Sequence, residues 1–179
     1  IALLSLMRST RAPALRHAHA AWNEVVARDP WNRFAYHEVL HHLAPSAPGR
    51  GSLVEMTHFA RLSAERAPYG SPLVLLPLAA RVERVAHSRR SGTSEFVSAI
   101  IWREPGAAQE IDTALDRWFR ADAPPRAQAL ADLNLLAFAL TRARRTAEAA
   151  PVFRRIGRHM TRYPWNSVSD PVGTFLHWR

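Results

Sequence analysis

The sequence contains no cysteine, so it can form neither a disulfide bond nor a thiolate metal site. It also contains no lysine: all 24 of its Lys and Arg positions are arginine. There is no glycine-rich phosphate loop and no serine nucleophile elbow. The apolar start, "IALLSLM", is too short to span a bilayer and lacks the basic region and cleavage site of a signal peptide. These absences predict a cytoplasmic chain without a membrane segment.

With 179 residues, the chain is long enough to bury one core. We expect a single α-helical repeat domain over residues 1–179. Because the chain begins with Ile1 rather than methionine, we also expect it to be a fragment or processed form of a longer protein. The net charge of +9 favours acidic partners. Since acidic residues lie between most of the arginines, the clustered footprint of a nucleic-acid binder is mostly missing.

Helical patterns dominate the sequence. Arginine and alanine are good helix formers, and apolar residues recur at three- and four-residue spacing. Asn32 and Ser52 are typical helix caps, and Pro77 is expected to kink or restart a buried helix over residues 71–85. Composition predicts loops at 44–51 and 121–127. The stretch "EFVSAIIW" at 95–102 fits a helix or a strand, and its helical neighbours favour a helix.

Two five-residue segments resemble each other, "RDPWN" at 28–32 and "RYPWN" at 162–166. Each comes after a helical stretch in which a small residue precedes an aromatic residue by four positions and a β-branched residue by seven. The small residue allows two helices to approach closely, and the aromatic ring fills the space between helix hairpins. The members of the two sets are Ala18, Trp22 and Val25, and Ala149, Phe153 and Ile156.

This pattern resembles the second helix of the tetratricopeptide (TPR) repeat, and residues 133–156 resemble both helices of one such repeat. The resemblance implies an all-α fold of stacked antiparallel helix hairpins, a degenerate TPR-like right-handed array. The spacing from Pro68 to Pro124 departs from the family's usual length of about 34 residues. A non-repeating helical bundle is therefore the alternative. The stretch from "DPWN" to "GSPL" also resembles a group of bacterial helical-repeat proteins without an assigned function.

The motif with most chemical meaning is H-E-x-x-H, formed by His37, Glu38 and His41. In zinc peptidases, histidines at i and i+4 bind one zinc ion from the same helix face, and the glutamate acts as general base. No x-x-G-x-x-H extension comes after the motif. Glu55 and Glu65 are the nearby carboxylates that could supply a third ligand from the next helix.

The TPR resemblance gives the same histidines another interpretation. In TPR proteins the second, fifth and ninth positions of the first helix line a concave groove. A helix that begins at Arg33 places its groove residues at Phe34, His37 and His41, and the later repeat places Asn134 and Phe138 there, with Arg142 farther along the same face. A third interpretation is that the histidines are half-exposed residues of an ordinary helix surface.

We therefore predict a non-enzymatic module that binds a protein or peptide in this groove, without a cofactor or a bound metal. The competing hypothesis is a zinc-dependent hydrolase with His37 and His41 as ligands and Glu38 as base. Another is a nucleic-acid binder that uses the arginine stripe at Arg154, Arg158 and Arg162, although such a stripe is more often a solvated helix face.

Overall fold

The computed structural model describes residues 14–46, 51–92, 99–121 and 128–179. Within these ranges the chain forms helices and turns, and no strand, so the all-α prediction is confirmed. In chain order the elements are α2 (Ala14–Arg28), α3 (Arg33–Leu43), α4 (Leu53–Arg66), the 3₁₀-helix η1 (Pro72–Leu75), α5 (Leu76–Arg90), α7 (Pro105–Ala114), the π-helix η2 (Leu115–Phe119), α8 (Ala129–Arg142), α9 (Thr146–Ile156), α10 (Arg162–Trp165) and α11 (Pro171–Trp178).

Short polar side chains cap several helices, and Asn32 and Ser52 do so where the sequence predicts a cap. Asn32, Ser52 and Asp170 cap α3, α4 and α11. Each side-chain oxygen accepts a hydrogen bond from the backbone N–H three residues later, at 3.0, 3.3 and 2.9 Å. These bonds satisfy amide groups that have no partner within the helix, and each such cap typically contributes about 1 kcal/mol.

The most deeply buried stretch is 71–82, in which every residue is buried. Pro72 lies in the first turn of η1 and Pro77 in the first turn of α5. The first turn of a helix tolerates proline because a backbone N–H at that position has no acceptor within the helix. Pro77 therefore restarts the helix, one of the two outcomes expected for it.

The two "PWN" segments have different structures. Residues 29–32 form the turn between α2 and α3, where Trp31 is partly buried and stacks on Tyr36 with a ring-centroid separation of 6.5 Å. Residues 162–165 form the short helix α10, and Trp165 is fully buried against the edges of Phe138 and Phe175. The same Pro-Trp-Asn sequence thus places Trp31 in a partly exposed turn and Trp165 in the core.

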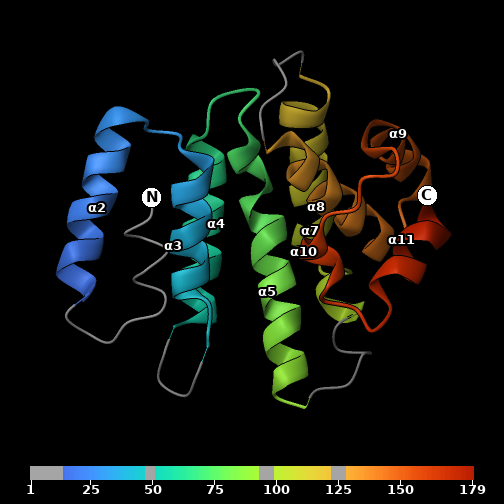
Figure 1. The fold of residues 1–179 in the computed structure, drawn as a ribbon, viewed down its shortest axis with the longest axis horizontal. Helices are drawn as coiled ribbons and strands as arrows, with labels where there is room; N and C mark the ends of the chain where they lie inside the picture. Colours follow the sequence, from blue (N-terminus) through green and yellow to red (C-terminus); the bar gives the residue numbers. More distant parts are fainter. Residues whose placement is uncertain (1–13, 47–50, 93–98, 122–127) are drawn as a thin grey trace.

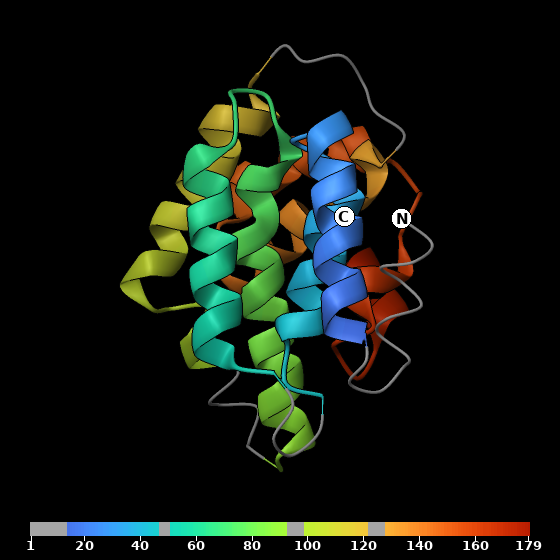
Figure 2. The ribbon, with the colours of Figure 1, turned by 90° about the vertical axis from the view of Figure 1, so that its left-hand side faces the viewer.

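The helices are arranged in a row, with α2 at one end of the long axis and α9 and α11 at the other (Figure 1). Viewed from the α2 end, the axes of α2, α4 and α5 run roughly parallel (Figure 2), and α4 packs on α5. The buried apolar side chains form one cluster from α3 to α11. At the near end, Trp22 of α2 contacts the rings of Tyr36 and Phe59, with centroid separations of 4.9 and 6.3 Å.

No helix in the described ranges has the length and apolar character needed to cross a bilayer. The predicted loops at 44–51 and 121–127 lie partly or almost wholly outside the described residues. The same holds for the first half of the stretch 95–102. Its residues 99–101 are helical, in agreement with the preference for a helix there.

Candidate binding sites

The two motif histidines lie on a largely buried face of α3. His37 is only 8% exposed, and its Nε2 has no hydrogen-bond partner among the described residues. His41 lies one turn later, with a separation of 6.4 Å between the two ring centroids. Its Nδ1 lies 3.4 Å from Oε1 of Glu83 on α5. The pair therefore lies where α3 meets its neighbours rather than on an open surface.

Burial lowers the pKa of His37 well below the ordinary histidine value, and the nearby charges of Arg33 and His41 lower it further. His37 is therefore neutral at pH 7, the form that a metal ion would bind. In the described part of the chain, however, no group of three histidine, aspartate or glutamate side chains is close enough to hold an ion. Glu83 contacts His41 without completing such a group.

Tyr163 packs against His41 in an edge-to-face arrangement, with 6.1 Å between the ring centroids. Its hydroxyl donates a 3.5 Å hydrogen bond to the backbone oxygen of Ala79 on α5. Burial raises the pKa of the Tyr163 phenol well above its usual value, and the carboxylate of Glu83 raises it further. The sequence pattern did not indicate Glu83 or Tyr163, because neither residue belongs to the motif.

Two of the predicted groove residues are buried in the core. Asn134 is 0% exposed and Phe138 is 2% exposed. The Asn134 amide donates to the backbone oxygens of Leu130 and His159, at 2.9 and 3.1 Å, and its Oδ1 accepts from Trp165 Nε1 at 2.8 Å. Polar groups buried in this way are typical of a structural network.

The six predicted groove residues therefore do not share one open face. His37, Asn134 and Phe138 are buried, His41 and Arg142 are partly buried, and Phe34 is exposed. The TPR register placed all six on a concave side, whereas neighbouring helices cover that face at α3 and α8. Of the six, Phe34 lines the cavity described next.

That cavity, which we call the aromatic pocket, has a volume of about 390 Å³. It lies between the α2–α3 turn, the segment from Pro68 to Pro72 and the start of α8. Three rings line it: Trp31, Phe34 and Tyr69, of which Phe34 is 36% and Tyr69 is 69% exposed. The α2–α3 turn contributes Asp29 to the lining, and the start of α8 contributes Gln128 and Asp132.

An ion pair between α3 and α8 lines the same pocket. Arg33 Nε and Nη2 both lie 2.6 Å from Oδ1 of Asp132. The Asp132 side chain is only 2% exposed and that of Arg33 17%. Because a buried carboxylate is costly without such donors, this pair fixes the wall of the pocket as well as the contact between the two helices.

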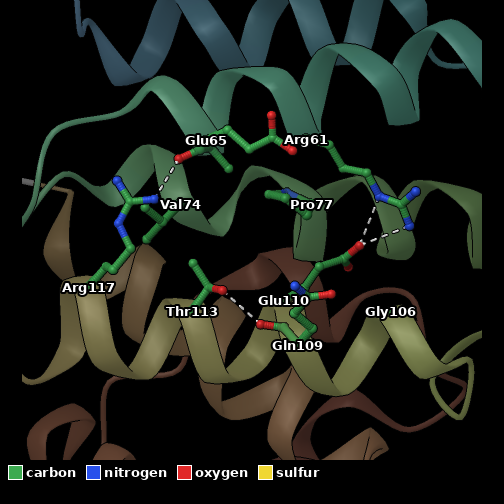
Figure 3. A pocket seen from close by; sticks show the side chains of 10 residues that line it. Arg61, Glu65, Val74, Pro77, Gly106, Gln109, Glu110, Thr113 and Arg117 are labelled. Atoms are coloured by element: carbon green, nitrogen blue, oxygen red, sulfur yellow. Dashed lines mark hydrogen bonds and ion pairs between the residues drawn. The ribbon is translucent and has the colours of Figure 1, made fainter.

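A second cavity, the arginine cleft, has a volume of about 480 Å³ and is lined by α4, α7 and the segment between Val74 and Pro77. Arg61 and Arg117 lie at its opposite ends (Figure 3). Glu65 also lines it, while Glu55 is exposed in the first turn of α4. Both volumes are in the range of small-ligand or peptide-anchor sites.

Comparisons with protein-family models, with curated proteins and with solved structures find no match to this chain. Its function is therefore inferred from the side chains that line these cavities.

Proposed function

We propose that this chain is a helical interaction module that binds an extended peptide segment of a partner protein in the aromatic pocket. The observation that carries this proposal is the exposure of Tyr69 and Phe34 around a cavity with a polar edge. Partly exposed aromatic side chains around a depression supply large contact area at low entropic cost, which is the usual composition of binding hot spots.

The lining indicates the chemistry of the peptide. Tyr69, Trp31 and the neighbouring Pro68 and Pro72 form walls suited to an apolar anchor, such as a proline or an aliphatic side chain. Gln128 can bond to the peptide backbone at the edge. Because the whole chain carries a net charge of +9, acidic residues on either side of the anchor would be attracted to it.

We propose a degenerate TPR-like array of stacked hairpins as the scaffold of this module. In support, consecutive helices pack on each other, α4 on α5 and α8 on α9, within a row of helices. Ala149, Phe153 and Ile156 are buried at the positions where the repeat pattern requires core residues. A non-repeating bundle is the alternative scaffold and would leave the pocket unchanged.

Panning a random peptide library on the purified protein tests the proposal, with counter-selection on Tyr69→Ala. Enriched peptides should bind the wild-type chain with micromolar Kd and lose about tenfold or more on Tyr69→Ala, since truncation of an aromatic hot spot costs about 2 kcal/mol. The matched control is Val54→Ala, because Val54 is 78% exposed on α4 and does not line the pocket.

Peptides that bind the wild-type chain, Tyr69→Ala and Val54→Ala equally would show a binding surface elsewhere. A library without any binder that depends on Tyr69 would refute the aromatic pocket as the peptide site.

A further inference from the structure

The arginine cleft is lined by charged side chains that differ between its two ends. Side chains from α7 lie along one wall, with Glu110 near Arg61 at one end and Thr113 toward Arg117 at the other (Figure 3). Arg117 donates to the backbone oxygens of Ala64 and Ala67, so it is engaged with the end of α4. The other end of the cleft, around Gly106, is built differently.

A buried arginine lies behind that end. Arg81 on α5 is 2% exposed and donates hydrogen bonds to Glu110 at 2.5 Å, to Glu104 at 2.8 Å and to the backbone oxygen of Ile101 at 2.6 Å. Its Nε and Nη1 are thus used, while its Nη2 is buried without a hydrogen-bond partner among the described residues. A buried guanidinium donor left without an acceptor costs roughly 1–3 kcal/mol or more.

Gly106 lies beside this donor. A Cβ atom on Gly106 would lie 3.3 Å from Nη2 of Arg81 and 3.3 Å from Nη2 of Arg61. Because glycine has no side chain, two guanidinium groups flank a position that any other residue would fill. We call this position the Gly106 seat. The two flanking donors suit an oxygen atom of an anion that approaches Gly106 from the cleft, and Oε1 of Glu110 lies 3.9 Å from the same position.

The local charge favours an anion as well. Arg81 bonds to Glu104 and Glu110, Arg84 bonds to Glu104, and Arg61 bonds to Glu110. These three arginines and two glutamates carry one excess positive charge. The seat also lies in the first turn of α7, where the helix dipole attracts negative charge.

We propose that the Gly106 seat binds the carboxylate or phosphate group of a small organic anion, with the apolar body of the ligand against Val74 and Pro77 of the cleft. Arg61, whose side chain is half exposed, turns to admit the ligand and then closes on it. The orphan Nη2 of Arg81 then gains its acceptor. This site is separate from the aromatic pocket, so either can exist without the other.

Titration of ¹⁵N-labelled protein with hexanoate, hexan-1-ol and inorganic phosphate tests this assignment by NMR. Hexanoate should shift the amide signals of Gly106 and Ala107 and the side-chain signals of Arg61 and Arg81, with a saturable millimolar Kd. Hexan-1-ol, which has the apolar body without the charge, should leave them in place. Phosphate that shifts the same signals more strongly would identify the seat as a phosphate site, and a weaker phosphate effect would identify it as a carboxylate site.

Gly106→Ala places a methyl group in the seat and should weaken hexanoate binding about tenfold. The fold should persist, because alanine is the better helix former and the methyl requires shifts of only about a few tenths of an ångström. Arg61→Gln should weaken binding similarly without filling the seat. The matched charge control is Arg154→Gln, since Arg154 is exposed on α9.

Three results would each overturn the proposal. The first is that hexanoate and hexan-1-ol shift the NMR signals of the seat residues equally. The second is that Gly106→Ala binds hexanoate as tightly as the wild type. The third is that the Gly106 amide signal shows no saturable response to hexanoate or phosphate.

Discussion

Arg33 on α3 donates through both Nε and Nη2 to one oxygen of Asp132 on α8, at 2.6 Å, across 99 positions of sequence. The bond joins α3, which carries the H-E-x-x-H motif, to α8. It also lines the aromatic pocket. The stability of this part of the fold and the shape of the pocket therefore depend on the same two side chains.

Arg33→Ala should destabilise the protein by about 3 kcal/mol, because it removes both guanidinium hydrogen bonds from a buried carboxylate. The double variant Arg33→Met with Asp132→Leu should recover at least half of that loss, since the buried charge is then gone. Urea unfolding followed by circular dichroism measures both values.

The control is Arg28→Ala, which removes the exposed ion pair of Arg28 with Glu24 and should change stability by less than about 1 kcal/mol. A loss for Arg33→Ala as small as that of the control would show that the buried pair is not needed.

Glu104 links pH to stability on the acid side. Hydrogen bonds from Arg84, aided by Arg81, lower the pKa of Glu104 from about 4.5 to about 2. A carboxyl whose pKa is depressed in the folded state contributes stability that is complete above 4.5 and is lost as the pH falls toward 2. The free-energy difference between wild type and Glu104→Gln should therefore be constant above about pH 5 and shrink below it. A pH-independent difference would contradict the pairing.

His37 links pH to stability in a higher range. Its pKa is lowered in the folded state by burial and by Arg33 and His41. Below the ordinary histidine value of 6.5, the unfolded chain takes up a proton that the folded chain does not. Stability should thus fall as the pH drops below about 6.5, by up to about 1.4 kcal/mol per pH unit from this residue. In His37→Gln this part of the slope should vanish, and an unchanged slope would show that His37 is solvated.

Zinc binding distinguishes the module from the hydrolase hypothesis. We expect protein purified with zinc to retain much less than one equivalent by elemental analysis, because no third ligand group converges on His37 and His41 in the described ranges. His41→Ala should leave that content unchanged. One zinc per chain in wild type that disappears in His41→Ala would instead favour the hydrolase, with Glu38 as its base.

The parts of the fold that sequence could predict are those decided by neighbours along the chain. Asn32 and Ser52 cap their helices through the amide three residues later, so their roles are readable from a few letters. The core positions Ala149 and Phe153 are predictable from helical periodicity. Each of these depends on contacts within about one or two turns of helix.

The site was less predictable because its contacts are distant in sequence. His41 meets Glu83, and Asn134 meets Trp165, through packing that no local pattern encodes. The repeat register assigned Phe34 and Asn134 to one open groove, whereas Phe34 lines a cavity and Asn134 is buried. Asn134 is instead buried because the segment before Trp165 returns over α8 and supplies hydrogen-bond partners for its amide.

The π-helix η2 continues α7, and it changes the direction in which the side chains after Ala114 point. Its wider turn, closed by the bond from Arg120 N–H to Leu115 oxygen at 2.9 Å, behaves as a one-residue insertion that rotates the residues after it. Arg117 thereby reaches the end of α4, while Phe119 lies under the guanidinium of Arg155 from α9, 4.3 Å from the ring centre. Deleting a single residue here would turn one of these two contacts away by about 100°. Insertions and deletions in this turn would thus change how η2 packs on α4 and α9, and they would also move Arg117 at its end of the arginine cleft.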